Sequence, residues 1–395
     1  MNFSGLAAPG LRPSAAAHRM MAIKDAKVEY HDLDSGVKEI YGSGSVSGNP
    51  TYQALDFATL ARITLLIFAQ GSSRNGADSL FCGRSHQPRS RHELSRRKLM
   101  ALSQGSSLKH QSLSVRRANA ADAESCGRIC FEAFSKVAAE NNFPPEFPSP
   151  EITKGILSTM FSHPAFFCVV AEQEGKVIGS NCLDERTPIA GIGPITIDPT
   201  VQNRTAGRQL MLAVMSRATE RKFVGIRLVQ AAYHNRSLSL YAKLGFVVRE
   251  PLACMQGPAI QKVISGYRVR PAQAVDLAVC NDLCLKVHGH HREGELNDAI
   301  QQGTAVLAEL NGRVRAYATS VAYFGHAVGE TNQDLQALIA VANEFQGPGI
   351  LVPTRNAGLF RWCLENGLRV VQPMTLMTIG LYNEPTGAYL PSILF

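Results

Sequence analysis

The sequence lacks a hydrophobic run that could cross a membrane. The apolar stretch at residues 57–69 is shorter than the roughly 20 residues that a spanning helix needs, and Arg62 interrupts it. It lies too far along the chain for an ordinary signal peptide, and no convincing small-residue cleavage pattern follows it. We therefore predict no membrane passage and, by default, a cytoplasmic protein.

Paired cysteine motifs are also lacking. The nine cysteines are odd in number and scattered along the chain. Cys126 and Cys130, like Cys280 and Cys284, have helical spacing, but no second pair or histidine completes a metal site. We predict buried thiols in a reducing compartment and no metal centre.

Acidic residues are scarce in one segment. Residues 71–117 hold ten basic and two acidic side chains, which accounts for the whole net charge of +8, so the remainder of the chain is balanced. A basic, Ser/Gly-rich run of this kind can bind nucleic acid or anionic lipid, but it is more typical of a solvated tether. Nucleic-acid binding therefore stays an alternative and not our prediction.

Residues 1–110 lack hydrophobic periodicity and contain spacers such as "GSGSVSGNP". We predict a low-complexity, disordered leader over this range. Met100 precedes the first well-patterned region, and an alternative is that the native chain starts near it. The sequence leaves that choice open.

Beyond residue 112 the chain repeats itself. Residues 115–130 align without gaps on 269–284, and 169–179 align on 306–316, where both copies turn through a glycine as hairpins do. Residues 241–248 align on 363–371 when one extra residue is allowed after the glycine. Three correspondences in one order predict two copies of one fold, at 113–255 and 267–383.

Each copy is predicted to be mixed α/β, with a mostly antiparallel twisted sheet flanked by helices. Asn119 or Asp122 is expected to cap the first helix and Asn235 the last, which Gly245 ends in a left-handed conformation. The loop at 141–150 holds four prolines and should be irregular. The predicted elements are strand 113–117, helix 121–137, strands 166–172, 177–183 and 192–198, helix 205–221, strand 226–232 and helix 235–245.

The helix expected at 205–221 begins in the small and polar stretch "VQNRTAG", just after Pro199. Unpaired amides and a positive dipole make such a helix start attractive to anions, and small residues let a diphosphate approach. The stretch has no Gly-Lys-Ser/Thr, so it is no Walker loop, and it has one of the three glycines of a Rossmann turn. We predict an anion cradle.

Residues 202–207, Gln-Asn-Arg-Thr-Ala-Gly, resemble the acetyl-CoA signature Gln/Arg-x-x-Gly-x-Gly/Ala of the GNAT superfamily of N-acetyltransferases. "ITIDP" (195–199) resembles the family's central strand, and "NRSLSLYAKLGF" (235–246) resembles its Asn…Leu-Tyr-x-Lys-Leu-Gly-Phe element. The resemblance covers about 113–255 well and 267–383 faintly. Thr205 replaces a glycine: its amide donates as that of glycine does, and its Cβ narrows the approach but is tolerated if its φ is negative, so we expect reduced tolerance and not loss of the site.

The resemblance implies acetyl-CoA as co-substrate, with direct transfer of the acetyl group to a primary amine of a small molecule or peptide. Tyr241 is implied as the acid that protonates the departing thiolate, its alternative being a core tyrosine. Asn235 has the alternative of serving as a helix cap alone. The implied cofactor-binding residues are Ile195 and Ile197 through their backbones, Gln202, Asn203, Arg204, Thr205, Ala206, Gly207, Arg208 and Asn235.

A general base is harder to place, because strand 192–198 contains no glutamate. We select Glu185, at the end of the preceding strand. Asp184, His234 and a water chain are alternatives, as is Glu146, whose proline-rich loop borders the acceptor site in the family.

The second copy reads "GETNQDLQALIAVA" (329–342) where the cradle should be. Glu330 and Asp334 would repel phosphates there, and Cys363 stands at the position of Tyr241. We predict a degenerate copy without cofactor, which either shapes the acceptor pocket or serves as scaffold. A non-catalytic acyl-CoA-binding or sensing protein is the alternative function, and a homodimer stays open.

Overall fold

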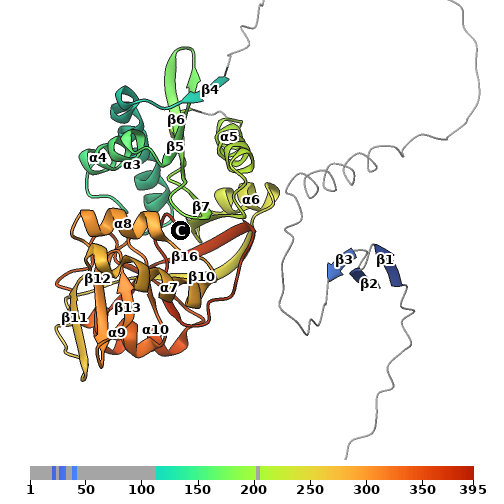
Figure 1. Cartoon of the computed structure of the whole chain (residues 1–395). Helices are drawn as coiled ribbons and strands as arrows, with labels where there is room; N and C mark the ends of the chain where they lie inside the picture. Colours follow the sequence, from blue (N-terminus) through green and yellow to red (C-terminus); the bar gives the residue numbers. More distant parts are fainter. Residues whose placement is uncertain (1–19, 24–25, 33–37, 42–112, 202–204) are drawn as a thin grey trace, which may run out of the picture. The chain divides into compact units, whose positions relative to one another are not determined.

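The computed structural model describes residues 20–23, 26–32, 38–41, 113–201 and 205–395 (Figure 1). The chain divides into two units, residues 1–77 and residues 78–395. In the first unit, β1 (Met20–Ile23), β2 (Ala26–Asp32) and β3 (Lys38–Tyr41) form an antiparallel sheet inside the leader, where we expected no regular structure. The rest of the predicted leader, through residue 110, lies outside the described residues.

The second unit is mixed α/β, as predicted, and most expected elements are present. Its first half has β4 (Leu113–Arg117), η1 (Ala120–Asp122), α3 (Ala123–Glu140), α4 (Pro150–Ser162), β5 (Phe166–Gln173), β6 (Lys176–Asp184), β7 (Ile189–Ile192), β8 (Thr196–Ile197), α5 (Ala206–Glu220), β9 (Gly225–Ala231), α6 (Asn235–Lys243) and β10 (Val247–Gln256). The second half has β11 (Tyr267–Pro271), η2 (Ala274–Asp276), α7 (Leu277–His288), α8 (Glu293–Gln301), β12 (Val306–Leu310), β13 (Arg313–Ala318), β14 (Ala327–Gly329), α9 (Asn332–Val341), β15 (Ile350–Pro353), α10 (Ala357–Glu365), β16 (Arg369–Gly380) and β17 (Ala388–Leu390).

Two local predictions need correction. The strand expected at 192–198 is broken into β7 and β8 by Gly193 and Pro194, because a proline cannot donate to a strand ladder. Helix α4 was not predicted at all. It begins at Pro150, the last proline of the loop at 141–150, and a proline suits the first position of a helix.

The two halves repeat each other down to single contacts. Both hairpins turn through two residues with positive φ, at 174–175 (52° and 74°) and 311–312 (53° and 74°). One arginine in each half ties the first strand to the following turn and to the hairpin through the ion pairs Arg116–Asp122 and Arg116–Glu172, and Arg270–Asp276 and Arg270–Glu309. The aligned sequences therefore fold alike.

Helices cover both faces of the first-half sheet. Val169 and Ala171 of β5 pack with buried side chains of α5, whereas Cys168 and Val170 pack with those of α3 and α4. Because successive side chains of a strand point to opposite faces, α5 lies on one face of the sheet and the α3–α4 pair on the other.

Every cysteine that the structure describes is a buried free thiol.

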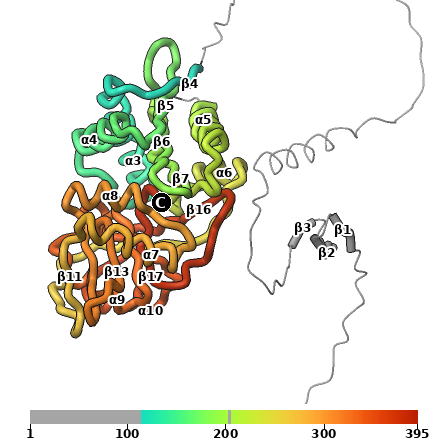
Figure 2. The backbone as a smooth tube through the Cα atoms, viewed as in Figure 1, coloured from blue at the N-terminus to red at the C-terminus, as the bar shows by residue number. Residues whose placement is uncertain are grey.

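The halves also exchange strands. The large sheet runs in the order β15-β10-β16-β9-β7-β6-β5-β4, with β8 paired to β6. Strand β16, from the end of the second half, lies between β9 and β10 of the first half, and β10 in turn pairs with β15. Figure 1 shows the red β16 beside β10, and Figure 2 shows the same red segment at the junction of the halves. The predicted boundary between the copies, near residues 254–266, therefore divides the sequence but does not divide the sheet.

Candidate active site

An opening in the sheet begins where two parallel strands separate. Strands β7 and β9 pair from Ile189 and Gly225 to Gly191 and Arg227. Beyond that point the chain turns at Gly193 and continues as β8, which pairs with β6. Strand β9 therefore lacks a neighbour on that side over its last residues within the described part of the chain.

The opening leads into a cavity of about 1110 Å³. On the α5–α6 side it is lined by Gly207, Arg208 and Tyr241, and on the α3–α4 side by Glu146 and Phe147. Since these helices cover opposite faces of the sheet, the cavity passes through the sheet between the diverging strands. A ligand entering from one face can thus meet a second ligand from the other.

The start of α5 faces this cavity. The helix begins at Ala206, one residue after the predicted start, and its first turn holds no acidic residue. Gly207 and Arg208 line the cavity, and Thr205 has the negative φ of −100° that a threonine needs there. Gln202, Asn203 and Arg204, three of the predicted cradle residues, lie outside the described residues.

Basic side chains surround the α5–α6 end of the cavity. Arg208, Arg236 and Lys243 are exposed and line it. Positive charge beside a helix N-terminus suits a phosphate-bearing ligand. Sequence reasoning had selected Arg208 but missed Arg236 and Lys243, which stand on α6 at helical spacing and carried no motif of their own.

The backbone of β8 presents an open edge to the cavity. The amide of Asp198 donates to Ile178 of β6 at 2.8 Å. Because backbone groups of a strand alternate sides, those of Ile195 and Ile197 point away from β6, and both residues line the cavity. The structure thus brings the two predicted backbone positions to the opening.

Asn235 lines the cavity but does not cap α6, which corrects one prediction. The helix begins at Asn235 itself, so the cap position belongs to His234, whose Nδ1 lies 2.8 Å from the hydroxyl of Ser237. In the second half, Asn356 does stand at the cap and accepts from the amide of Leu359. Asn235 thus stands one residue further into its helix than Asn356 does, and it lies beside the cavity.

Gln230 was missed by sequence reasoning. It is 6% exposed, lines the cavity, and neither its Nε2 nor its Oε1 has a hydrogen-bond partner among the described residues. Leu228 packs in the same cluster as Tyr241, so Gln230, two residues along β9, points to that same α5–α6 face. A buried amide is normally hydrogen-bonded, so Gln230 offers a free donor and a free acceptor to whatever occupies the cavity. No motif marks it.

Tyr241 is brought to the cavity on α6. It is 6% exposed and its ring lies edge-on to Phe246, with centroids 6.2 Å apart. Burial raises the pKa of Tyr241 to about 12, against a smaller opposite effect of Ser237, so the phenol keeps its proton at neutral pH. Tyr241 thus belongs to the hydrophobic core and also lines the cavity with a protonated phenol.

Glu146 lies at the other end of the cavity. It is 7% exposed, and Tyr323 of the second half donates its hydroxyl hydrogen to Glu146 Oε2 at 3.1 Å. Desolvation raises the pKa of Glu146 to about 7, although the Tyr323 hydrogen bond opposes this shift. A carboxyl group with this pKa can take up and release a proton near neutral pH.

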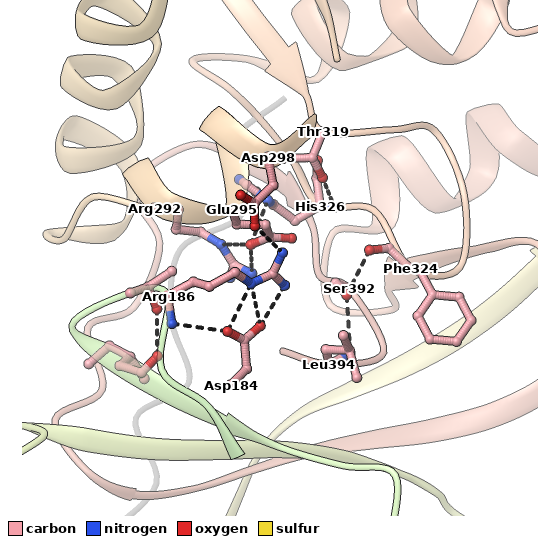
Figure 3. Close-up of polar contacts among 12 residues, drawn as sticks. Asp184, Arg186, Arg292, Glu295, Asp298, Thr319, Phe324, His326, Ser392 and Leu394 are labelled. Atoms are coloured by element: carbon pink, nitrogen blue, oxygen red, sulfur yellow. Dashed lines mark hydrogen bonds and ion pairs between the residues drawn. The ribbon is translucent and has the colours of Figure 1, made fainter. Parts of the chain in front are cut away.

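Glu185, our selected base, is not among the residues that line the cavity. Arg217 of α5 binds both of its carboxylate oxygens, at 2.7 and 3.1 Å. Asp184 is held by Arg186 at 2.6 Å, and Arg186 also binds Asp298 of α8 (Figure 3). These positions do not support either residue as the base, because arginine partners occupy both carboxylates away from the opening. His234 does line the cavity, and burial lowers its pKa.

The equivalent places in the second half are filled. At the start of α9, Thr331 and Asp334 form a reciprocal capping box, and Asp334 is fully buried. Strand β17 pairs with β14, the counterpart of β7, and packs against β15, the counterpart of β9. In the second half the helix start is therefore capped by its own chain and β17 bridges the two strands, whereas in the first half Gly207 and Arg208 of α5 line the cavity between the separating strands.

Within the described residues, no helix has the length and apolar composition needed to span a membrane.

A scan against protein families matches residues 133–246 to the acetyltransferase (GNAT) family. No curated protein matches the chain by sequence.

Three solved structures align with this chain at low sequence identity. A Pyrococcus horikoshii protein assigned provisionally as an acetyltransferase aligns with a TM-score of 0.56 and 18% identity, over 72% of this chain and 96% of that one. A GCN5-related N-acetyltransferase from Sphaerobacter thermophilus aligns with a TM-score of 0.47 and 13% identity, over 69% and 96%. A tandem GNAT protein from the clavulanic acid biosynthesis pathway gives 0.44 and 14%, over 68% and 98%. The first alignment shows the fold of this chain in an experimental structure.

Proposed function

We propose, from the premise that residues 133–246 form an acetyltransferase domain of the GNAT family, that this chain transfers the acetyl group of acetyl-CoA to a primary amine. The observation that carries the proposal is the cavity through the sheet. It joins an anion-attracting helix start and a protonated tyrosine on one face to a buried carboxyl group on the other.

The α5–α6 end of the cavity fits acetyl-CoA, which supplies the activated acyl group when bound. The N–H groups at the start of α5, with Arg208 beside them, would hold the diphosphate. The open edge at Ile195 and Ile197 would pair with the pantetheine amides, and the unpartnered amide of Gln230 offers one further donor and acceptor. The roles implied for Gln202, Asn203 and Arg204 stay predictions.

Glu146 replaces Glu185 as our proposed general base. An ammonium group must lose a proton before its nitrogen can attack, and a carboxyl group with a pKa of about 7 accepts that proton at neutral pH. Tyr323 fixes the orientation of Glu146 by donating to Oε2. The proton thus leaves the amine inside a buried site and is released when the product departs.

Tyr241 is proposed as the general acid. Its phenol keeps its proton at neutral pH, since burial raises its pKa to about 12, whereas a thiol has a pKa near 8.5. As the carbon–sulfur bond breaks, the phenol gives its proton to the sulfur, and the phenolate takes up the second proton that the acylated nitrogen loses. Protonated thiol and acetylated amine then leave from opposite faces of the sheet.

The second half is proposed to bind no acetyl-CoA. Its helix α9 is capped by its own Thr331 and Asp334, and β17 occupies the space between the counterparts of the diverging strands. Two independent features thus support a degenerate copy.

Two measurements on the full chain test the proposed function. Calorimetry should show acetyl-CoA binding at one site per chain, and an amine panel should release free thiol from acetyl-CoA. Binding without transfer to any amine would favour the non-catalytic acyl-CoA-binding protein, and absence of binding would refute both functions.

A further inference from the structure

We infer that the acceptor is a primary amine on an uncharged, apolar body, and that the two halves of the chain build its compartment together. This inference rests on the proposed acetyl transfer, and it names the substrate class. The acceptor compartment is the part of the cavity on the α3–α4 side of the sheet, around Glu146.

Apolar side chains form the walls of the acceptor compartment. From the first half, Phe134, Phe147 and Ile156 line the cavity and pack in one hydrophobic cluster. From the second half, Phe324 and Leu394 line the cavity and pack in that same cluster. Aromatic and aliphatic walls of this kind favour an apolar ligand body, at about 25 cal/mol for each Å² removed from water.

Charge in the compartment is limited to one buried group. Among the described residues that line the cavity, Glu146 is the one charged side chain that is buried, whereas Lys136 and Glu140 are exposed at the end of α3. The hydroxyl groups of Thr153 and Tyr233 are neutral and already bonded, to backbone oxygens and to Gln372 respectively. One ammonium group therefore finds a buried partner in Glu146. A second buried ammonium group would find none, because the other carboxylate on the α3 side of the cavity, Asp198, is only partly buried and already lies 3.9 Å from the guanidinium of Arg128.

The second half holds its part of the wall in place through Ser392, which is fully buried. Ser392 donates its hydroxyl hydrogen to the Phe324 carbonyl at 3.1 Å and accepts from the Leu394 amide at 3.1 Å (Figure 3). The Ile393 amide donates to the carbonyl of Tyr323, the residue that orients Glu146. The same short segment thus positions both the apolar wall and the partner of the carboxyl group.

The segment also fits closely against the first-half sheet. A Cβ atom at Gly191 of β7 would lie 2.2 Å from the Leu394 carbonyl oxygen, so a glycine is required for this approach. The cavity of about 1110 Å³ exceeds the 300–1,000 Å³ typical of a site for one ligand. Space therefore remains for an acceptor beside a pantetheine arm.

The test compares two amines that differ at one end, hexylamine and 1,6-diaminohexane, with the full chain and saturating acetyl-CoA. Because the far ammonium of the diamine would be buried without a partner, we expect kcat/KM for hexylamine to exceed that for the diamine by about 100-fold. Equal turnover, or preference for the diamine, would overturn the inference and leave acetyl transfer intact. Transfer to no amine in a broad panel, with acetyl-CoA still bound, would overturn the proposed function and the inference with it.

A charged side chain introduced into the wall of the acceptor compartment gives a second, independent test of the inference. Ile393 also lines the cavity, so Ile393→Asp should lower the hexylamine-to-diamine ratio at least 10-fold by supplying a partner for the second ammonium, while acetyl-CoA affinity stays unchanged by calorimetry. Leu394→Ser, which keeps the segment neutral, should raise KM for hexylamine without favouring the diamine. Val263→Asp, at a side chain that is 85% exposed, is the matched control and should leave the ratio as it is. An unchanged ratio in Ile393→Asp that binds acetyl-CoA normally would refute the shared compartment.

Discussion

Replacing Glu146 with glutamine should separate the effect of this residue on the free energy of unfolding from its role in catalysis. Glu146 is buried, and its pKa rises from 4.5 to about 7 mainly because the charged form is desolvated. A difference of one pH unit between folded and unfolded pKa values is worth about 1.4 kcal/mol. The ionised carboxylate therefore destabilises the folded protein by about 3 kcal/mol relative to the unfolded chain.

The destabilisation of the folded protein by ionised Glu146 increases as the pH rises. The folded state binds the Glu146 proton more tightly than the unfolded state, so its stabilising contribution is complete below pH 4.5 and is lost as the pH rises through about 7. From this group the wild-type protein should lose about 2–3 kcal/mol between pH 5 and pH 9. Glutamine does not titrate. Its buried amide adds a cost of about 1–3 kcal/mol that is the same at every pH.

Urea denaturation of both proteins at pH 5, 7 and 9 measures this effect. The free energy of unfolding of Glu146→Gln, relative to wild type, should rise by about 2–3 kcal/mol across that range. Acetyl transfer should fall about 100-fold or more, as expected for loss of a general base. Glu140→Gln, at an exposed residue on the cavity rim, is the control and should change neither quantity. Parallel stability profiles would refute the raised pKa, and retained activity would remove Glu146 from the mechanism.

Three further predictions address the remaining site residues. Tyr323→Phe removes a hydrogen bond that favours the ionised form of Glu146, so the rise of kcat/KM with pH, centred near 7 in the wild type, should move to higher pH; an unmoved profile would show that Tyr323 does not tune the base. Tyr241→Phe should lower kcat about 100-fold and leave the Kd of acetyl-CoA nearly unchanged, and equal turnover would exclude Tyr241 as the acid. Gly207→Glu should abolish acetyl-CoA binding in calorimetry by adding charge to the helix start, whereas Gly207→Ala should bind, because its Cβ would meet Leu240 and Ile197 at 3.8 and 3.9 Å. Normal affinity in Gly207→Glu would refute the cradle.

Features that depend on neighbouring residues could be predicted from the sequence. The apolar spacing of Leu210, Val214 and Ala218 predicted helix α5, and all three are buried. Gly245 has the predicted left-handed conformation, with φ of 97°. Asn119 and Asp122, offered as alternative caps, both take part in one capping box at η1.

Predictions that depended on distant partners were less successful. Glu185 was selected because it follows a strand near the site, but Arg217, on another element, binds its carboxylate. Asn235 was expected to cap α6 because asparagine favours that position, yet His234 stands there. In both cases the residue type is known from the sequence. The partner that each polar side chain meets depends on how the helices and strands pack together.

The candidate base shows why no motif could identify this site completely. Glu146 and Tyr323 are 177 residues apart in the chain, and each belongs to a different half. They meet because β16 of the second half pairs with β9 and β10 of the first, which joins the halves through one continuous sheet. Ser392, Ile393 and Leu394, which shape the same end of the cavity, lie beyond the predicted limit of the second copy at residue 383. On the function proposed here, the second copy would hold no cofactor of its own and would complete the active site of the first, because exchange of strands brings the two copies into contact at the opening of the sheet.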